Sequence, residues 1–232
     1  MTNTDIQNNQ YEFPYHYLPS ISNNIPSIQK KLAWGVEYLT YMNVVIDEIS
    51  NLNINNILDI GCGDGYLLNN LAINADKFGV DLSNEAILFA QAFSNNAHFE
   101  VKDLLDIKMR YDLVTLIEVM EHIPDDELKL FMGKALNLIK EGGYLIVSVP
   151  TTVVPVHKKH YRHYDELTLT KHVQLNSSMK LIKEFRIYKN SYLLKFVIKI
   201  LSNNFWTINS NFILRFFWKW HNRYNKFATK KN

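Results

Sequence analysis

Cysteine, glycine and proline are all scarce in this chain of 232 residues, which has 1 Cys, 8 Gly and 6 Pro beside 13 Phe and 13 Tyr. One cysteine cannot form an internal disulfide, so the class of small disulfide-stabilised secreted proteins is excluded. With 47% hydrophobic and 21% charged residues, the composition also excludes collagenous, low-complexity and disordered proteins. Length and composition together indicate one globular domain, or one domain with an appendage.

Segments that would direct the chain to or across a membrane are also missing. The start, MTNTDIQNNQ, has neither a basic region nor an apolar run, so we expect no secretory signal. No stretch reaches the roughly 18–20 uncharged apolar residues that a bilayer-spanning helix needs. We therefore expect a cytoplasmic protein.

The low net charge of +2 hides an uneven distribution. Residues 183–232 contain 11 Lys and Arg but a single acid, Glu184, which leaves 14 basic and 22 acidic residues in positions 1–182. The chain is thus an acidic body of net charge −8 followed by a basic tail of net charge +10. This asymmetry favours contact of the tail with something anionic, a membrane surface or a nucleic acid, although a solvated helix face is the simpler explanation.

Short apolar runs alternate with helical stretches between Asn55 and Phe185, as in a parallel sheet built from βαβ units. We expect five strands, at Asn56–Ile60, Lys77–Asp81, His98–Val101, Tyr111–Glu118 and Tyr144–Val149. A sixth strand is expected at Leu181–Tyr188. Between them we expect helices at Tyr66–Ile73, Asn84–Phe93 and Glu127–Ile139, with Ser83 and Asp125 as N-caps. The chain is therefore predicted to be an α/β protein with a mostly parallel central sheet flanked by helices.

The two ends of the chain differ from this central pattern. Residues 1–52 contain an aromatic stretch (Tyr11, Phe13, Tyr15, Tyr17) and one or two helices over Pro26–Leu52, which we interpret as a cap. Residues 191–232 form a tail with helices predicted at Ser191–Ser202 and Asn211–Lys230. In the second helix a basic stripe is expected opposite its aromatic side chains; the two sets are Arg215, Lys219, Arg223, Lys226, Lys230 and Phe212, Phe216, Phe217, Trp220. Residues 53–190 remain as the central domain.

A glycine-rich turn is the strongest local motif. The first predicted strand runs into Gly61-Cys62-Gly63-Asp64-Gly65 and then into a helix. Glycines at such a turn let backbone N–H groups and the helix N-terminus approach a ligand closely. The spacing is G-x-G-x-G rather than the G-x-G-x-x-G of dinucleotide enzymes, and Asp59 lies on the strand two residues before the first glycine. This spacing argues against a nicotinamide-dependent dehydrogenase.

The run from Asn55 to Phe185 resembles the class I S-adenosylmethionine-dependent methyltransferases, whose Rossmann-like fold the strand pattern also fits. In that family an acid at the end of the second strand binds the ribose hydroxyls, and Asp81 in Val80-Asp81-Leu82 has that position. An acid after the third strand contacts the adenine, which corresponds to Asp103 in Asp103-Leu104. The resemblance implies S-adenosylmethionine as cofactor, bound by Asp59, Gly61, Cys62, Gly63, Gly65, Asp81, Leu82, Asp103, Leu104 and Glu118.

One family element has no clear counterpart. Class I methyltransferases usually end with an antiparallel seventh strand inserted beside the sixth. After Asn190 the sequence is helical and basic, and Thr207–Leu214 is the one candidate. Either that strand lies there, or the tail covers the sheet in its place.

A second group of candidate site residues follows the fourth and fifth strands. If the chain turns helically after Leu116, then Glu118, Glu121 and His122 stand at i, i+3 and i+4 and share one face. Two histidines, His160 and His163, follow the fifth strand. Both groups follow the carboxyl ends of strands, where open α/β sheets bind ligands. Two carboxylates and an imidazole form a reasonable ligand set for Mg²⁺ or Mn²⁺.

The pattern E-x-x-E-H resembles two branches of the same family, the ubiquinone-biosynthesis O-methyltransferases and the enzymes that methylate the terminal 2′-hydroxyl of small RNAs. In the RNA branch both glutamates, the histidine and one later histidine hold a divalent metal. The resemblance implies a metal site of Glu118, Glu121, His122 and His160, with His163 as the substitute. The alternative is that the two glutamates border the pocket and His122 bonds a backbone carbonyl.

The chemistry of an oxygen acceptor explains why such residues would be needed. A neutral hydroxyl is a poor nucleophile, so the site must remove its proton or bind the developing alkoxide. A metal would do both, and without one His122, His160 or His163 would be the base. We therefore hypothesise O-methylation of a small molecule with adjacent hydroxyls.

Several acceptors and one non-enzymatic role stay open. A saccharide or glycan precursor is favoured by the small size of the chain and by the aromatic N-terminal segment. A quinone precursor comes second, because the amphipathic basic tail could hold the enzyme at the cytoplasmic face of a membrane. Terminal RNA methylation is third, since the body is acidic and no RNA-binding module is present. The non-enzymatic alternative is an S-adenosylmethionine-binding regulatory subunit. No pattern in the sequence identifies the acceptor or the oligomeric state.

Overall fold

The computed structural model describes residues 20–22, 24–27, 32–94, 96–156, 159–173, 179–187, 192–203, 205–208 and 210–229. These residues fall into two compact units. The first unit contains Ser50–Lys180, and the second joins the described residues up to Ile49 to those from Leu181 onward. The predicted aromatic segment at residues 11–18 lies outside the described residues.

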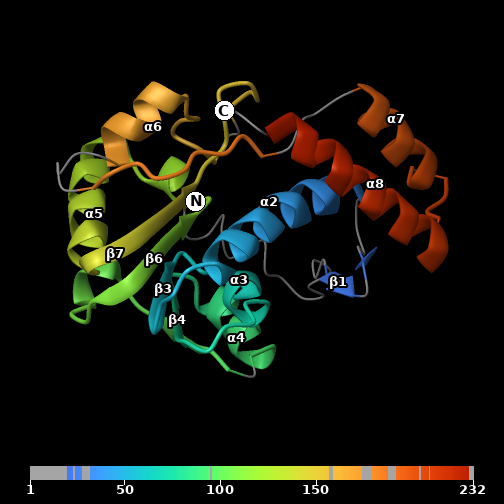
Figure 1. Cartoon of the computed structure of the whole chain (residues 1–232). Coiled ribbons are helices and arrows are strands. Elements are labelled where there is room, and N and C mark those ends of the chain that lie inside the picture. Colours follow the sequence, from blue (N-terminus) through green and yellow to red (C-terminus); the bar gives the residue numbers. More distant parts are fainter. Residues whose placement is uncertain are drawn as a thin grey trace. The chain divides into compact units, whose positions relative to one another are not determined.

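The first unit is built on a five-stranded parallel sheet (Figure 1). Its strands are β3 (Asn56–Ile60), β4 (Asp76–Asp81), β5 (His98–Val101), β6 (Tyr111–Ile117) and β7 (Ile139–Ser148). The order is β5-β4-β3-β6-β7, so the chain moves outward from β3 in one direction and then returns to its other side. The point between β3 and β6 is a topological switch point, at which α/β sheets bind ligands. The predicted α/β fold and five of its strands are confirmed.

Helices cover both faces of this sheet. The helices α3 (Tyr66–Asn69) and α4 (Asn84–Ala92) lie on one side, and α5 (Asp125–Asn137) and α6 (Glu166–Val173) lie on the other (Figure 1). Ser83 is the N-cap of α4 as predicted, because its hydroxyl accepts from the Ala86 N–H at 3.2 Å. Asp125 is not the cap of α5: the cap is Pro124, and Asp125 is the first helical residue.

The strands of this unit are rich in apolar residues because both faces of the sheet are buried. A parallel sheet covered on both faces buries successive side chains in both directions. Leu58 of β3 and Val114 and Leu116 of β6 are fully buried. Met120 and Met132 complete the same hydrophobic cluster from the α5 side. The strands are therefore held rigidly, and the loops at their carboxyl ends are positioned by them.

The last strand of the sheet is longer than the sequence indicates. β7 begins at Ile139 rather than Tyr144, so Glu141, Gly142 and Gly143 lie inside it. Tyr111 pairs with Ile139 while Leu113 pairs with Tyr144, so the extra residues form an irregularity in the ladder. A glycine is required there because Gly142 has a φ of 74°. The strand therefore continues through both glycines, with a bulge in its pairing with β6.

The second unit contains the hairpin β1 (Ser20–Ser22) and β2 (Ile25–Ser27) and the helices α2 (Leu32–Ser50), α7 (Tyr192–Leu201) and α8 (Asn211–Thr229). The predicted start of a helix at Pro26 is wrong, because Pro26 lies in β2 and α2 begins at Leu32. The two predicted tail helices are confirmed in type and approximate bounds. In α8 the residues that turn inward are Leu214, Phe217, Trp218 and His221. Phe212 and Phe216 are exposed instead, so the predicted separation of aromatic and basic faces is wrong.

The sixth strand predicted at Leu181–Tyr188 is not formed in the part of the chain described, and the candidate for a seventh, Thr207–Leu214, is not a strand there either. Residues 181–187 have no regular secondary structure, although Phe185, Arg186 and Ile187 alternate between apolar and charged as in a strand. No strand pairs with them, and a strand without a ladder partner has no backbone hydrogen bonds to stabilise it. Thr207 makes an isolated bridge with Ser202, and Asn211 already begins α8. The helical spacing of the apolar residues decides the conformation there.

Candidate active site

The glycine-rich loop joins β3 to α3 and is fastened to the neighbouring strand β4. The backbone N–H groups of Gly61 and Cys62 both donate to the carbonyl of Val80, at 2.8 and 3.0 Å. Gly61, Gly63 and Gly65 have φ values of 73°, 54° and 76°. Residues with a Cβ rarely adopt this left-handed region, so the three alternate glycines are what allows the loop its conformation.

The same loop passes directly against the segment that follows β6. A Cβ on Gly61 would lie 2.6 Å from Cγ2 of Val119. The glycine is thus required by space as well as by its φ. Since Val119 lies between Glu118 and Met120 at the start of the E-x-x-E-H segment, the two predicted sites are neighbours across the switch point.

Asp81, at the carboxyl end of β4, is buried with both oxygens oriented by backbone N–H groups. Its Oδ2 accepts from Gly63 N at 3.0 Å and its Oδ1 from Ser83 N at 2.8 Å. Burial raises the pKa of this carboxyl, and the backbone hydrogen bonds partly offset the increase. A carboxylate has about four acceptor positions, so two adjacent hydroxyls can still be accommodated. Leu82 beside it is exposed and could cover a planar ligand.

Asp59 lies inside the sheet rather than at its open edge. Its Oδ1 accepts a hydrogen bond from the Thr115 hydroxyl of β6 at 2.6 Å. Burial raises the pKa of Asp59 to about 7; the bond from Thr115 lowers it and the charge of Asp81 raises it further. Asp59 therefore fixes the spacing of β3 and β6 beneath the loop.

Asp103 and Leu104 follow β5 at the same edge of the sheet. Oδ1 of Asp103 accepts from Leu105 N at 2.8 Å and caps the short 3₁₀ turn η1 (Leu104–Asp106). The Leu104 side chain is buried. The structure thus shows a turn residue, and an adenine contact through this turn remains a prediction.

The segment after β6 does not form the predicted helix. Glu118 has a φ of 56°, and the 3₁₀ turn η2 (Met120–His122) begins only two residues later. The expectation that Glu118, Glu121 and His122 share one helical face is therefore wrong. Glu118 turns toward β7 instead, where its N–H donates to the Ser148 carbonyl at 2.9 Å and its Oε1 accepts from the Ser148 hydroxyl at 2.5 Å. Such a backbone conformation in a residue with a side chain costs about 1–3 kcal/mol and is concentrated at functional sites.

Glu121 has the most unusual environment of the candidate residues. Its side chain is fully buried, and neither carboxylate oxygen has a hydrogen-bond partner among the described residues. Burial, and then the charge of Glu118, raise the pKa of Glu121 to about 8. A buried carboxylate without a donor is unfavourable, so the site must supply a proton or a cation.

Two histidines complete a cluster with Glu121. A ligand atom from each of Glu121, His122 and His160 can be chosen so that all lie within 4.8 Å of one another. The rings of His122 and His160 meet edge to face with centroids 4.7 Å apart. Glu118 is not a member of this group. The structure therefore brings together three of the four predicted metal ligands.

Further polar partners orient the two imidazoles. Nδ1 of His122 lies 3.2 Å from the Lys159 carbonyl, and Nδ1 of His160 lies 2.9 Å from Nε2 of His163. Nδ1 of His163 in turn lies 2.8 Å from the Val154 carbonyl. Histidines that bind metals are oriented in this way by bonds to their other nitrogen. The Glu121 carboxylate, which has no hydrogen-bond donor among the described residues, and the two oriented imidazoles fit a divalent cation.

This cluster lies within electrostatic reach of Asp81. A positive charge on His122 lowers the pKa of Asp81, although Asp81 ends β4 and His122 lies in η2 after β6. Together with the contact of Gly61 and Val119, this places the histidines at the same edge of the sheet as the glycine-rich loop. The arrangement can hold a charged ligand over the loop with an acid–base or metal group beside it.

Arg162 is a residue whose role the sequence does not show. Its guanidinium donates to the carbonyls of Met120 and Ile123 at 2.8 and 2.6 Å and to Oδ1 of Asp125 at 2.8 Å. These partners lie 37–42 residues earlier in the chain. Arg162 thus ties the loop after β7 to both ends of η2 and keeps His160 beside Glu121. The one available signal is its position between two candidate histidines.

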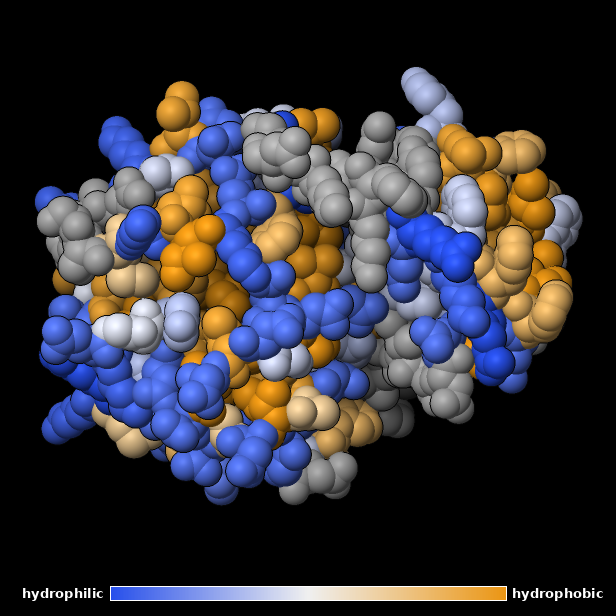
Figure 2. Space-filling model, viewed as in Figure 1, coloured by the Kyte–Doolittle hydropathy of each residue, from blue (hydrophilic) through white to orange (hydrophobic). Residues whose placement is uncertain are grey.

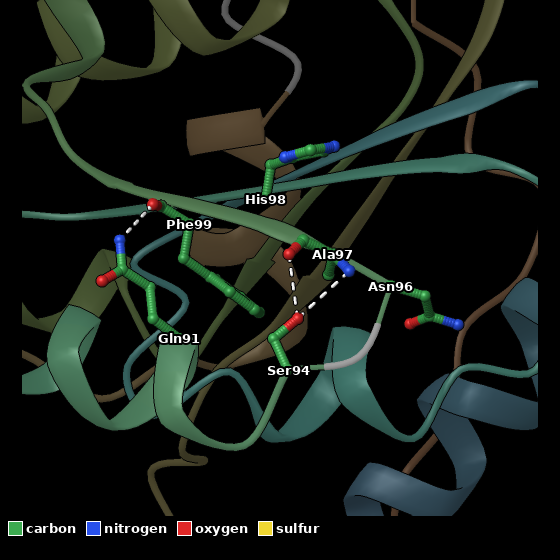
Figure 3. Close-up of a pocket in the computed structure, with 6 residues that line it drawn as sticks. All are labelled: Gln91, Ser94, Asn96, Ala97, His98 and Phe99. Carbon is green, nitrogen blue, oxygen red and sulfur yellow. Dashed lines mark hydrogen bonds between the residues drawn. The ribbon is translucent and has the colours of Figure 1, made fainter.

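A hollow of about 470 Å³ lies elsewhere on the first unit, lined by residues from the end of α4 to the start of β5 (Figure 3). Two of the polar side chains drawn there already bond to neighbouring backbone: Gln91 Nε2 donates to the Phe99 carbonyl at 2.9 Å, and the Ser94 hydroxyl donates to the Ala97 carbonyl at 2.9 Å. The hollow is at the amino end of β5, whereas the candidate residues follow the carboxyl ends of strands. It is therefore separate from the candidate site.

Comparison with known proteins assigns the family. Residues 36–187 match the family model described as a methyltransferase domain. A ubiquinone biosynthesis O-methyltransferase of Azorhizobium caulinodans is 38% identical over 100 residues, covering 40% of this chain and 39% of the relative. One of Glaesserella parasuis is 32% identical over 123 residues, covering 47% and 50%. The chain spans half or less of the length of these curated relatives.

Solved structures show the same fold. The magnesium protoporphyrin IX methyltransferase of Synechocystis PCC 6803 with bound S-adenosylmethionine is similar with a TM-score of 0.56 and 21% identity, covering 82% of this chain and 89% of that one. The N-methyltransferase NodS of Bradyrhizobium japonicum WM9 in complex with S-adenosyl-L-homocysteine has a TM-score of 0.57 and 17% identity, covering 75% and 86%.

The fold and the loop at its switch point define the class, that of the Rossmann-like class I methyltransferases. The chain belongs to the methyltransferase domain family, and the resemblance expected from its motifs is confirmed.

Proposed function

We propose that this chain is an S-adenosylmethionine-dependent O-methyltransferase that acts on a hydroxyl of a small molecule. The observation that carries the proposal is the juxtaposition of the glycine-rich loop with the cluster of Glu121, His122 and His160. The contact of Gly61 with Val119 and the effect of His122 on the pKa of Asp81 both place the two groups side by side. A methyl donor over the loop would then face an acid–base group.

The cofactor part of the proposal rests on the loop and the acids around it. Asp81 would accept from the ribose hydroxyls, Asp103 and Leu104 would border the adenine, and Leu82 would cover it. The loop residues Gly61, Cys62, Gly63 and Gly65 would meet the rest of the cofactor with their backbone, and Glu118 would close the site from β6. Asp59 acts from below, because its bond to Thr115 holds the two strands under the loop.

The reaction needs removal of one proton. A bond forms between the acceptor oxygen and the methyl carbon while the bond from that carbon to sulfur breaks, which leaves S-adenosylhomocysteine and one released proton. His122 or His160 would accept the proton from the hydroxyl, since an imidazole titrates near neutral pH. His163 positions His160 through the bond between their ring nitrogens. Each of these steps is carried by residues of this chain.

A divalent cation, Mg²⁺ or Mn²⁺, is the second part of the proposal. Glu121, His122 and His160 would hold it, with Glu118 as a further candidate from the sequence. When bound, the cation would stabilise the alkoxide and orient two neighbouring hydroxyls. Its positive charge would also compensate the buried carboxylate of Glu121, which accepts no hydrogen bond among the described residues and lies 3.9 Å from Nε2 of His122.

The acceptor is proposed to be a compound with adjacent hydroxyls. A saccharide or glycan precursor follows from the sequence, but the aromatic segment that favoured it lies outside the described residues. A quinone precursor of the catechol type is the second candidate. It is favoured by the names of the curated relatives and by the exposed apolar side chains of Val153, Val154 and Val156, in the loop whose Val154 carbonyl lies 2.8 Å from Nδ1 of His163. For that acceptor the enzyme would work at the cytoplasmic face of a membrane.

Two experiments test the proposal. Isothermal titration of S-adenosylhomocysteine should give binding that falls at least about tenfold in Asp81→Asn, since a charged hydrogen-bond acceptor is lost. Transfer of a labelled methyl group from S-adenosylmethionine should then be measured with catechols, monosaccharides and RNA fragments. Cofactor binding with no transfer to any acceptor would favour the regulatory-subunit alternative.

The metal and the base are distinguished in the same assay. Loss of transfer on exhaustive chelation, restored by Mn²⁺ or Mg²⁺, is expected if the cation takes part. Full activity after chelation would remove the metal from the proposal. Unchanged activity in the double variant His122→Ala with His160→Ala would remove both histidines as base and as ligands.

A further inference from the structure

Helix α7 is apolar on two sides, but only one of them is covered. Leu194, Ile198 and Leu201 form its buried face. Leu193, Phe196 and Ile200 form a second apolar face that is exposed to solvent, with the Phe196 ring 63% exposed. A group of neighbouring exposed apolar side chains indicates an interaction surface, because monomeric proteins keep exposed apolar patches small.

Helix α8 repeats the same arrangement. Its inward residues include Leu214, Phe217 and Trp218, while Phe212 and Phe216 are 81% and 71% exposed. Phe212 and Phe216 are four residues apart, so both lie on one side of the helix. The two tail helices therefore each bury one face and expose aromatic or aliphatic side chains on another.

The turn between the helices holds two more aromatic rings in solvent. Asn203 Oδ1 accepts from the N–H groups of Phe205 and Trp206 at 2.8 and 3.2 Å, and Asn203 N donates to the Trp206 carbonyl at 2.9 Å. Trp206 Nε1 donates to the Ile200 carbonyl at 2.9 Å. The turn is thus fixed by its own bonds, yet the Phe205 ring is 90% exposed. Burial in the fold therefore does not account for an aromatic residue at that position.

Basic side chains border this apolar surface. Lys195 and Lys199 follow one side of α7, and Arg215 and Lys219 follow one side of α8; all four are exposed. Neither helix contains an aspartate or a glutamate, and Glu184 is the last acid in the sequence. In Figure 2 hydrophobic side chains gather over α7 with a hydrophilic strip beside them. The surface is therefore both apolar and positively charged.

We propose that α7, α8 and the turn between them form a docking surface for an anionic lipid bilayer. The aromatic rings of Phe196, Phe205 and Trp206 would enter the region between headgroups and acyl chains, and the lysines and arginines would contact lipid phosphates. Among the described residues no helix is long and apolar enough to cross a bilayer. The contact is thus with one leaflet, and it does not depend on the methyltransferase activity.

Two other occupants fit the surface less well. A second copy of the chain would bring the same positive charge to the interface, and like charges oppose such a contact. A single-stranded nucleic acid would satisfy the cations and could stack on Trp206, but Leu193 and Ile200 have no ring on which a base could stack. A bilayer uses both the cations and the aliphatic side chains.

The test is flotation of the full chain with vesicles of phosphatidylcholine alone or mixed with phosphatidylglycerol. Binding should be at least about tenfold stronger with the anionic vesicles, since each cation near the surface adds attraction to anionic headgroups. The double variant Phe205→Ser with Trp206→Ser should bind at least about tenfold more weakly to both kinds of vesicle. Lys195→Gln with Lys199→Gln should lose the preference for anionic lipid.

The control variant changes two exposed leucines of the other unit, Leu130→Ser on α5 and Leu167→Ser on α6. It should bind vesicles as the unchanged chain does. The replaced side chains are all exposed, so each variant is expected to fold. Titration of S-adenosylhomocysteine and circular dichroism of each variant check this and separate loss of membrane binding from loss of folding.

Three results would overturn the proposal. The first is no flotation of the unchanged chain with anionic vesicles. The second is a dimer in sedimentation equilibrium that the Phe205→Ser and Trp206→Ser changes dissociate, without any binding to vesicles. The third is retention on single-stranded RNA, lost in the same variants, again without binding to vesicles.

Discussion

Gly61 shows how a single residue joins the two halves of the candidate site. Its φ of 73° gives the loop its course, and the absence of a Cβ gives Val119 its space. A glycine in a strand-to-helix turn can be predicted from sequence, but the contact with Val119 cannot, since the two residues are 58 positions apart in the chain. The structure thus adds the reason why this position excludes alanine.

Gly61→Ala should destabilise the chain by about 1–3 kcal/mol, because both the left-handed backbone and the contact with Val119 oppose a Cβ. The affinity for S-adenosylhomocysteine should fall as well. Gly133 in α5 is the matched control, because a Cβ there would meet nothing within 4 Å. Gly133→Ala should stabilise by about 0.5–1 kcal/mol. Chemical denaturation measures both; equal effects of the two substitutions would contradict the reasoning.

Asp59 should make the stability of the unliganded chain depend on pH. Burial raises its pKa from 3.8 to about 7, so between these values the folded chain keeps a proton that the unfolded chain has lost. Stability should therefore fall as pH rises from about 4 to about 7, by about 1.4 kcal/mol for each pH unit at most. Asp59→Asn keeps the acceptor for Thr115 and should flatten this slope in urea unfolding across the pH range. An unchanged slope would assign it to other groups.

At the scale of elements, Arg162 fixes the position of η2 relative to the loop after β7. Its bonds to Met120 and Ile123 keep Glu121 and His160 together. Lysine at this position can keep the charge but not the planar set of donors. The arginine acts through the residues it positions and has no contact with a reacting atom in this account.

Arg162→Lys should destabilise the chain by about 2–4 kcal/mol, because hydrogen bonds from a charged donor to backbone carbonyls are lost. It should also weaken binding of Mn²⁺, measured by titration, more than the loss of stability alone would. Arg110→Lys is the control, since Arg110 is exposed on the connection into β6. Equal metal affinity in Arg162→Lys and the unchanged chain would show that Arg162 does not position the cluster.

The contact between α2 and α8 depends on a histidine that stays neutral. Nε2 of the fully buried His221 lies 2.8 Å from the Thr40 hydroxyl, and its ring stacks on Phe217 with centroids 6.0 Å apart. Burial lowers the pKa of His221 from 6.5 to about 4. The unfolded chain therefore takes up a proton between these values that the folded chain does not, and stability is lost as pH falls from 6.5 to 4.

Protection of α8 amides from hydrogen exchange, corrected for the intrinsic effect of pH, should fall over that range. In His221→Gln protection should be lower at neutral pH but no longer depend on pH there. His98→Gln, at an exposed position on β5, should behave as the unchanged chain. The same acid sensitivity in His221→Gln would mean that another group carries it.

The elements that the sequence predicts well are those with a repeating apolar pattern and a neighbour to pair with. Asn56–Ile60 and His98–Val101 agree with β3 and β5 in both bounds. Residues 181–187 are rich in apolar side chains but pair with no described strand, and pairing cannot be read from one segment. The course of Glu118 is equally hidden, because the short bond to the Ser148 hydroxyl comes from a different strand. Local pattern predicts an element, and its partner decides whether the element forms.

For the whole molecule, the charge asymmetry now has a structural counterpart. The acids proposed for the site, among them Asp59, Asp81 and Glu121, all belong to the unit of Ser50–Lys180, and residues 181–229 with their excess of cations belong to the other unit. The sequence therefore predicts the division of charge but not the exposed aromatic side chains beside it. The spacing of apolar residues predicts a helix at Phe216 but does not tell whether its side chain is buried. In the structure Phe217 and Trp218 are buried, and Phe216 is exposed.

The most direct test of the central claim is a crystal structure of the full chain with S-adenosylhomocysteine and Mn²⁺. We predict the ribose hydroxyls at Asp81, the glycine-rich loop beneath the cofactor, and an anomalous manganese peak among Glu121, His122 and His160. Cofactor density away from the loop, or a well-ordered complex with no peak at that cluster while manganese is bound elsewhere, would contradict the account.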